Sequence, residues 1–340
     1  MNNENGKRIR SAHIGMKFGM SHVEGALSYG ADIVAICDSD EGNLTFAGER
    51  YNIPPEKRIT DYKELVNNPD IDIVTVAVPD QQHRQISCEL LEAGKSVLCE
   101  KPLALTREDC EAIVKTASNS KGKFMVGQIC RFTPAFEKAK EIISSGAIGE
   151  VYFAESEYAH DYSSFLETWR ADPDRHGVIG GGCHAIDLLR WLVGDPKEVF
   201  AYGMHKLLPN VTYDDATIAI MKFDENVAGK VFVSTGCKRD YTMRTLIYGT
   251  KGTIICDNTS PTMTLFTVGE DGLAHEPQII DVEVNNHNAA KEFEVLADAV
   301  INDKKVETDA LEGAKTIAVC RAVVESSVSG KIIKPDYNFG

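Results

Sequence analysis

Three consecutive residues, Glu100-Lys101-Pro102, bring an acid, an amine and a proline together at the end of a largely apolar run at 95–99. Such a run is typical of a buried strand, so the three residues are expected at its carboxyl end. In open α/β sheets, ligands bind outside the carboxyl ends of the strands. The proline indicates a tight turn, which can hold a cis peptide bond. Lys101 is therefore a candidate catalytic amine, and an ordinary strand end with a solvated lysine is the alternative.

A second candidate is His184, which follows three glycines at 180–182 and begins an amphipathic helical stretch. The positive end of a helix disfavours a charged imidazole, so a histidine there suits the role of a neutral base. Asp187 lies three residues further on and shares a helix face with His184. A structural histidine in front of an apolar helix is the alternative.

The turn after the first apolar run contains Gly15, Lys17, Phe18 and Gly19 and is similar to a dinucleotide-binding turn. The usual pattern is G-x-G-x-x-G, but here Lys17 replaces the middle glycine and the spacing to Gly19 is short. Glycine lets the backbone approach a pyrophosphate, and the following helix N-terminus donates to it. These four residues are therefore candidate cofactor contacts.

Asp38 ends the second predicted strand, about 20 residues after Gly15, where an acid binds the ribose hydroxyls of NAD. A carboxylate there would repel the extra phosphate of NADP, so NAD is the expected cofactor. Ser39 is compatible with NADP in a mixed-specificity site. The alternative is a helix-capping aspartate after a generic strand-to-helix turn.

The elements that must position these residues alternate between strand and helix in the first third of the chain. We expect strands at 9–14, 33–37, 73–78, 96–99 and 124–127, and helices at 21–29, 41–51, 82–93 and 106–118. The run at 73–78, closed by Pro79, is typical of a parallel strand buried on both faces. The alternation predicts a doubly wound parallel sheet, an α/β dinucleotide-binding domain of the Rossmann type over residues 7–128.

From about residue 128 the pattern changes to alternating strands. They are expected at 151–158, 198–202, 215–223, 228–235, 242–249, 252–257 and 262–267, with helices at 135–145, 289–302 and 309–329. Alternation of apolar and polar residues is typical of antiparallel strands. The sequence therefore predicts a second, α+β domain over residues 129–340.

Composition excludes several classes of protein. The 340 residues suit about two domains. A net charge of −15 argues against nucleic acid and anionic membranes as partners. The nine cysteines are scattered without a C-x-x-C pair, which indicates reduced thiols and no zinc site. No apolar run approaches membrane-span length and the N-terminus is polar, so we expect no signal peptide and a cytoplasmic protein.

Together these motifs resemble the Gfo/Idh/MocA family, named after glucose–fructose oxidoreductase and inositol dehydrogenase. The resemblance extends over nearly the whole chain and includes Glu100-Lys101-Pro102, the glycines before His184-x-x-Asp187, Val78-Pro79 with His83, Arg131-Phe132-x-Pro134 and Tyr248-Gly249-Thr250-x-Gly252. It implies a Rossmann domain followed by a domain with a large, mostly antiparallel open sheet. It also implies NAD- or NADP-dependent chemistry on a small-molecule sugar, cyclitol or polyol, and dimers or tetramers formed through the open face of that sheet.

The resemblance gives the catalytic roles to Lys101 and His184. Oxidising an alcohol removes a hydride from carbon and a proton from oxygen, and a neutral imidazole with a pKa near ~6.5 can accept that proton. A lysine ammonium can hold the oxygen and stabilise its developing negative charge. Our hypothesis makes His184 the base and Lys101 the orienting group, while the reversed assignment stays open.

Further contacts follow from position in the predicted strands and from the resemblance. Tyr158 ends the first strand of the second domain, and Trp169-Arg170 could stack on a sugar and bind a hydroxyl or phosphate. A hydrophobic plug and a surface salt bridge are the alternatives for this pair. The predicted cofactor contacts also include Val78, Pro79, His83, Glu100, Lys101 and Arg131, and the predicted substrate contacts are Tyr158, His160, Trp169, Arg170 and Asp187.

One position departs from the family. Many members carry an aspartate four residues before the histidine, and here that position is Gly180. Asp187, His160 or Asp161 could substitute for it in space. A metal held by His160, Asp161, His176 and His184 is an alternative that the loose spacing disfavours, so no metal is expected.

Three function classes follow. The leading one is an NAD-dependent dehydrogenase acting on a sugar, a sugar derivative or a cyclitol. The second retains NAD, oxidises a sugar carbon transiently and cleaves a glycoside without net NADH. The third is a dinucleotide-binding sensor, which the presence of Lys101 and His184 disfavours. Fold alone does not decide among them.

Overall fold

The structure is a computed structural model that describes residues 8–164, 168–269 and 271–340. The chain divides into two compact units: one contains the chain up to Gln128 with residues 288–314 and 338–340, and the other contains 129–287 and 315–337. This division differs from the expected boundary, which assigned all of 129–340 to the second domain. The reason is close helix packing within the first unit, where a Cβ on Gly25 would lie 2.8 Å from the carbonyl oxygen of Ala289.

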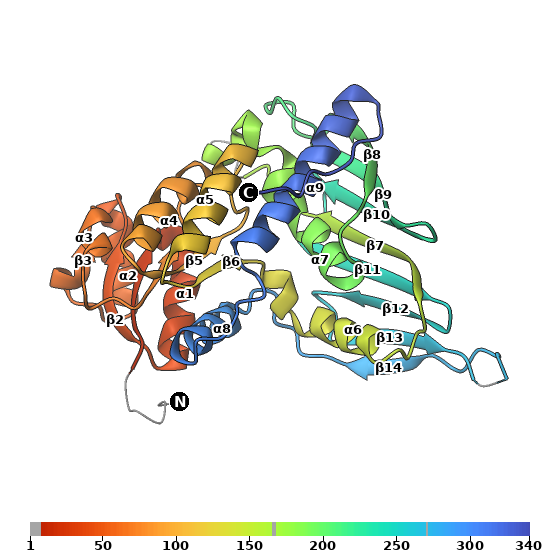
Figure 1. Cartoon of the computed structure of the whole chain (residues 1–340), viewed down its shortest axis with the longest axis horizontal. Helices are drawn as coiled ribbons and strands as arrows, with labels where there is room; N and C mark the ends of the chain where they lie inside the picture. Colours follow the sequence, from red (N-terminus) through yellow and green to blue (C-terminus); the bar gives the residue numbers. More distant parts are fainter. Residues whose placement is uncertain (1–7, 165–167, 270) are drawn as a thin grey trace. The chain divides into compact units, whose positions relative to one another are not determined.

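The first unit is built on a six-stranded sheet with the order β3-β2-β1-β4-β5-β6, in which all neighbouring strands are parallel (Figure 1). The strands are β1 (Arg10–Ile14), β2 (Asp32–Cys37), β3 (Arg58–Ile59), β4 (Ile73–Val76), β5 (Ser96–Glu100) and β6 (Phe124–Gly127). The helices are α1 (Met16–Tyr29), α2 (Glu41–Arg50), α3 (Lys63–Val66), α4 (His83–Glu92), α5 (Arg107–Asn119) and α8 (Ala289–Ile301). This order is that of a Rossmann fold and confirms the predicted fold class.

Apolar residues explain why the central strands lie inside the sheet. All four residues of β4 are buried, which confirms that this strand is covered on both faces. Helix α1 begins at Met16 and not near residue 21 as predicted, because Gly15 lets the chain turn directly from β1 into the helix. The short strand β3 was missed by the sequence analysis, since two residues carry no periodicity.

The second unit contains an eight-stranded sheet with the order β14-β13-β12-β11-β7-β10-β9-β8. Its strands are β7 (Val151–Ala159), β8 (Glu198–Met204), β9 (Ala216–Asp224), β10 (Val227–Ser234), β11 (Thr242–Gly249), β12 (Gly252–Asp257), β13 (Thr262–Thr267) and β14 (Gln278–Asp281). Every pairing is antiparallel except that of β7 with β10. The large, mostly antiparallel sheet is therefore confirmed.

Helices cover one face of this sheet. α6 (Pro134–Ser144) packs near β12, and α7 (Cys183–Val193) packs on β7 and β10 (Figure 1). Helix α9 (Ala310–Ser329) begins in the first unit and continues in the second. A π-helical turn, Val178–Gly182, leads directly into α7 where the sequence suggested a glycine turn. All nine cysteines are free thiols, and none of the helices described is long and apolar enough to cross a membrane.

Candidate functional site

The turn between β1 and α1 brings three stretches of backbone together. Gly15 is in the left-handed region, with φ 90° and ψ 77°, and its N–H donates to the carbonyl of Cys37 over 2.8 Å. A Cβ on Gly15 would lie 2.4 Å from the carbonyl oxygen of Ala77. Glycine alone combines this positive φ with so close an approach. The turn lies at the carboxyl end of β1 beside β4, where the strand order reverses and doubly wound sheets bind ligands.

The N-terminus of α1 suits an anion. Its first turn contains no acidic residue, and the side chains of Lys17 and Phe18 are exposed. Gly19 is buried against Met16 and Ala77, at 3.4 and 3.5 Å from where its Cβ would be. Backbone N–H groups and the helix dipole at such an end attract a pyrophosphate, and Lys17 adds a positive charge. All four glycine-turn residues singled out from the sequence therefore lie in this half of the site.

Asp38 holds the loop after β2 and the start of α1, and its contact with a cofactor stays a prediction. Its Oδ2 accepts the backbone N–H of Met16 over 2.7 Å and the side-chain amide of Asn43 over 3.3 Å. Its Oδ1 accepts the N–H of Asp40 over 2.9 Å, while Asp38 stays partly exposed and Ser39 is exposed. The carboxylate thus lies beside the N-terminus of α1, where one acid can meet a ribose while the helix end meets the pyrophosphate. The bond to Met16 was not foreseen from the sequence.

Glu100 and Lys101 occupy the carboxyl end of β5. The Oε1 of Glu100 lies 2.8 Å from Nε2 of the buried His22, and its Oε2 accepts the N–H of Lys101 over 3.2 Å. Burial opposes ionisation of Glu100, but the hydrogen bond and charge of His22 and the charge of Lys101 outweigh it and lower the pKa of Glu100 to about 2. Glu100 is therefore an ionised counter-charge behind Lys101. The Lys101–Pro102 peptide bond is cis.

His83 is fully buried beneath these turns, contrary to its predicted contact with the cofactor. Its Nδ1 lies 2.8 Å from the carbonyl oxygen of Pro102, and its Nε2 lies 3.1 Å from that of Val78. Burial lowers its pKa, but Cys99, Asp80 and the Pro102 carbonyl outweigh burial and raise it to about 10. Carbonyl oxygens only accept, so a protonated ring that donates from both nitrogens fits this geometry. His83 thus ties the end of β4 to the end of β5.

The first unit accordingly fits a dinucleotide. Its carboxyl edge combines the Gly15 cradle, the positive end of α1, the acid Asp38 and the partly exposed Val78-Pro79 turn after β4. These features are the ones that a Rossmann domain uses for the pyrophosphate, ribose and nicotinamide ends of NAD.

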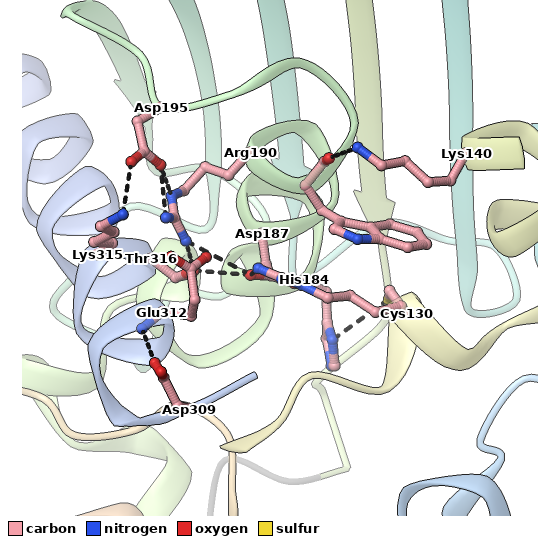
Figure 2. Close-up of polar contacts among 12 residues, drawn as sticks. Cys130, Lys140, His184, Asp187, Arg190, Asp195, Asp309, Glu312, Lys315 and Thr316 are labelled. Atoms are coloured by element: carbon pink, nitrogen blue, oxygen red, sulfur yellow. Dashed lines mark hydrogen bonds and ion pairs between the residues drawn. The ribbon is translucent and has the colours of Figure 1, made fainter. Parts of the chain in front are cut away.

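The second unit carries the histidine. His184 is the second residue of α7 and is 5% exposed. Its Nδ1 lies 3.6 Å from Sγ of Cys130, and its ring stacks on that of Tyr158, with centroids 5.9 Å apart and an angle of 18° (Figure 2 for the sulfur contact). The ring is therefore fixed both in its plane and in the direction of Nδ1.

Three further aromatic side chains, His160, Tyr162 and Tyr241, lie around this stacked pair. The Tyr158 hydroxyl lies 2.9 Å from that of Tyr162 and 3.2 Å from Nδ1 of His160. Tyr241 contacts both Tyr158 and His160 edge-on or tilted, with centroids 5.7 and 5.2 Å away. Burial raises the pKa of Tyr158 and of Tyr241 well above the usual tyrosine value, so both hydroxyls stay protonated. Such a set of rings and hydroxyls offers stacking and hydrogen bonds to a polyhydroxylated ligand.

An arginine occupies the place beside Gly180. A Cβ on Gly180 would lie 2.0 Å from Nη1 of Arg175, and Nη2 of Arg175 donates to the Gly180 carbonyl over 3.2 Å. The Arg175 guanidinium also lies over the ring of Trp169, with Cζ 5.0 Å from its centroid, and Arg170 lies at 4.5 Å. Trp169 and Arg170 are half-buried and pack on each other, so their predicted contact with substrate stays a prediction. Arg175 thus places a cation beside Gly180, the position at which the sequence departs from the expected family pattern.

Arg131 and Asp187, predicted as cofactor and substrate contacts, bind each other. Nε and Nη2 of Arg131 donate to the two oxygens of Asp187 over 2.9 and 2.7 Å, and Thr316 donates to Oδ1 over 2.9 Å. Both charged side chains are at most 6% exposed. Arg190 lies nearby and pairs with Asp195, as Figure 2 shows. This bidentate buried pair favours a structural role for Arg131 and Asp187, and their contacts with cofactor and substrate stay predictions.

The alternative metal set is not gathered around a common point. Within the described residues, no group of three or more His, Cys, Asp or Glu side chains is placed to hold a metal ion. Nε2 of His176 lies 3.7 Å from Asp214, and Asp161 pairs with Lys238 at 2.9 Å. The histidines of this unit are therefore engaged with other partners.

Comparison with known families decides the relationship. Residues 9–128 match the oxidoreductase family with an NAD-binding Rossmann fold, and residues 136–255 match the GFO/IDH/MocA C-terminal domain. The chain belongs to the Gfo/Idh/MocA family of oxidoreductases. The first unit is accordingly an NAD-binding Rossmann domain.

Curated relatives within the family have several substrates. The chain is 28% identical to an inositol 2-dehydrogenase of Salmonella typhimurium over 66% of its own length and 65% of the relative, so the match spans just under two thirds of that protein. It is 27% identical to a D-apiose dehydrogenase of Rhizobium rhizogenes, over 89% of this chain and 90% of the relative. Among solved structures, a levoglucosan dehydrogenase in complex with NADH has a TM-score of 0.86 at 22% identity, covering 97% of this chain and 100% of that one. At 22% identity, the similarity to this levoglucosan dehydrogenase structure concerns the fold alone.

Several residues of the clusters described above were missed from the sequence. They are Cys130, Tyr162, Arg175, Tyr241 and Glu292. Tyr162 follows Tyr158 by four residues and could have been noted as part of an aromatic cluster. The others are brought in by tertiary packing and leave no local signal.

Proposed function

We propose that this protein is an NAD-dependent oxidoreductase that transfers a hydride between the nicotinamide and a hydroxyl-bearing carbon of a sugar, sugar derivative or cyclitol. The observation that carries the proposal is the carboxyl edge of the Rossmann sheet, where Lys101 stands next to a dinucleotide cradle and in front of the ionised Glu100. The curated relatives that are named as inositol and D-apiose dehydrogenases support the substrate class.

Three groups of residues would have separate roles in cofactor binding, catalysis and substrate binding. Gly15, the N-terminus of α1 and Asp38 would hold the dinucleotide, which supplies hydride acceptance when bound. Lys101 and His184 are the two groups proposed to act on the reacting hydroxyl, one as hydrogen-bond donor and one as proton acceptor. Tyr158, Tyr162 and His160 would bind further hydroxyls of the substrate.

Turnover with a substrate panel tests the proposal. Purified protein and NAD are mixed with aldoses, sugar acids, amino sugars, inositols and glycosides, while NADH absorbance and product masses are followed together. Net NADH with one substrate supports the dehydrogenase. Product without net NADH would replace it with the transient-redox glycoside enzyme, and NAD binding without any turnover would favour a sensor.

Matched variants test the two catalytic assignments. Lys101→Met and His184→Ala should each lower kcat by roughly 10²–10⁴-fold with the substrate found. Lys121→Met and His275→Ala change exposed residues of the same types and should leave kcat unchanged. Near-full turnover in either site variant would remove that residue from the mechanism.

The open face of the eight-stranded sheet is the proposed surface for a homodimer or homotetramer. Phe200 pairs with Ile220 and Tyr202 with Ile218 across β8 and β9, and Tyr202 and Ile220 are 63% and 57% exposed. Such an apolar stripe is costly to leave in water. Light scattering of the protein and of Ile220→Lys tests this surface.

The free thiols agree with a reducing compartment, and we place the protein in the cytoplasm.

A further inference from the structure

Cys130 lies against Nδ1 of His184. It belongs to a short 3-10 turn, Ile129–Phe132, which follows β6, and its sulfur is 3.6 Å from Nδ1 of His184 (Figure 2). Cys130 and His184 are 3% and 5% exposed. The stacking of Tyr158 on the imidazole prevents the ring from turning away. The sulfur is therefore a fixed part of the histidine's surroundings.

A sulfur partner has a different effect on the ring from a carboxylate. An ionised carboxylate only accepts, so it fixes a hydrogen on the nitrogen that it faces and leaves the other nitrogen as a base. A thiol carries one hydrogen and its sulfur is a weak acceptor, whereas a neutral imidazole nitrogen is a good acceptor. The favourable arrangement has the S–H of Cys130 pointing at the lone pair of Nδ1. The hydrogen of the neutral ring is then on Nε2.

We propose that Cys130 is a positioning residue that holds His184 as the neutral tautomer with its hydrogen on Nε2. The histidine then presents an N–H donor to the oxygen of the substrate and not the lone pair of a base. This assignment rests on the proposed function for the identity of that oxygen. Of the two assignments that the sequence left open, it favours the reversed one, in which His184 is the hydrogen-bond donor and the proton of the breaking O–H bond forms an N–H bond at Nζ of Lys101, a step that requires the lone pair of that amine.

The surroundings of Gly180 agree with this tautomer. A carboxylate at position 180 could have faced the imidazole, but the space next to Gly180 is filled by the guanidinium of Arg175. A cation cannot accept a hydrogen bond from the histidine ring. The structure places the Cys130 thiol within bonding distance of Nδ1.

Nitrogen NMR of histidine side chains tests the proposal without any substrate. Protein labelled with ¹⁵N-histidine is studied at neutral pH by long-range proton–nitrogen correlation, and the signals lost in His184→Asn identify His184. A bare Nδ1 and a protonated Nε2 are expected. A hydrogen on Nδ1, whether in the other neutral tautomer or in a doubly protonated ring, would overturn the proposal.

Variants separate a specific effect from loss of packing. Cys130→Ser keeps a donor of similar size and should retain the Nε2–H tautomer, whereas Cys130→Ala should give a mixture of both tautomers. Cys130→Asp supplies an obligate acceptor and should move the hydrogen to Nδ1. Cys256→Ala removes a buried thiol that donates to the carbonyl of Thr245 and should leave the His184 signals unchanged. An unchanged tautomer in Cys130→Ala and Cys130→Asp would show that the sulfur does not set it.

Kinetics then link the tautomer to turnover. With the substrate identified by the panel, Cys130→Ala should lower kcat by about two- to tenfold, the effect of one lost hydrogen bond, and Cys130→Ser should restore it. Equal losses in both variants would contradict a positioning role. If no substrate turns over while the spectra show Nε2–H, the proposed function fails and the tautomer assignment stands.

Discussion

The guanidinium of Arg175 lies where a side chain on Gly180 would begin. Nη1 of Arg175 is 2.0 Å from the position of that Cβ, and Nη2 donates to the Gly180 carbonyl over 3.2 Å. The two residues are therefore coupled sterically and through a hydrogen bond. A side chain at position 180 therefore requires the guanidinium of Arg175 to move.

Replacing Gly180 should destabilise the protein as long as Arg175 is present. Gly180→Ala introduces a Cβ that requires the guanidinium to shift, and we expect a loss of about 1–3 kcal/mol in the free energy of unfolding. The double variant with Arg175→Ala should be more stable than the sum of the single effects predicts, since the clash is removed. Urea unfolding of the four proteins measures the coupling. Strictly additive effects would contradict the close approach.

Breaking the Arg131–Asp187 pair should cost more than breaking a surface pair. Arg131→Ala leaves the buried carboxylate of Asp187 without its bidentate partner, and a loss of about 3–5 kcal/mol is expected. Replacing both residues with Met and Leu should cost less, because no buried charge is then left alone. Lys138→Ala breaks an exposed pair with Glu141 and should cost less than about 1 kcal/mol. A double variant as unstable as Arg131→Ala would argue against this explanation.

The sequence predicted those parts of the molecule that local patterns specify. Apolar runs identified the central strands of the parallel sheet, and the positions of Gly15, Asp38 and Lys101 at strand ends followed from them. Alternation identified most strands of the second sheet, although β14 was missed because its four residues are mostly exposed. These features depend on residues close together in the chain.

Partners that are distant in the sequence could not be predicted. Arg131 and Asp187 are 56 residues apart in the sequence. Each residue, considered alone, lies where a ligand contact is as plausible as a buried ion pair. Likewise, His83 begins helix α4, where the sequence allowed both a cofactor contact and a helix-start residue satisfied by backbone; its burial and its two carbonyl neighbours match the second. Charged and polar residues are ambiguous in a sequence, since a buried partner and a ligand leave the same signal.

A buried acid on α8 should make stability depend on pH. Glu292 is 1% exposed, its Oε1 has no hydrogen-bond partner, and burial together with the charge of Glu100 raises its pKa well above the usual value, against the opposing charge of Lys101. The unfolded chain releases this proton near pH ~4.3, whereas the folded protein keeps it. Below that pH both states hold the proton, and Glu292 does not lower the free energy of unfolding. As the pH rises above it, the free energy of unfolding falls by up to about 1.4 kcal/mol per pH unit.

Glu292→Gln should remove that dependence. The variant side chain is neutral at every pH. The free energy of unfolding of the variant should therefore increase relative to that of the wild type as the pH rises above about 5. Glu294→Gln changes an exposed residue of the same helix and serves as the control. Thermal unfolding between pH 4 and pH 8 measures the difference. A constant difference between Glu292→Gln and the wild type over this range would mean that Glu292 is ionised in the folded protein.

Removing the carboxylate of Asp38 should relax the preference for NAD. Without its negative charge, the repulsion of the extra phosphate of NADP disappears, and the ratio of the dissociation constant for NADP to that for NAD should fall about tenfold or more in Asp38→Ala. Asp38→Ala also removes the oxygen that accepts the Met16 N–H at the start of α1. Because this bond holds the helix end proposed to bind the pyrophosphate, the affinity for both cofactors should decrease. Asp38→Asn keeps one acceptor oxygen without the charge and is compared with Asp38→Ala. It should show the same fall in the NADP-to-NAD ratio with a smaller loss of affinity for both cofactors. Dissociation constants from fluorescence titration with each dinucleotide measure both effects without a substrate. An unchanged ratio in both variants would mean that Asp38 serves the loop and the helix end and does not face the ribose.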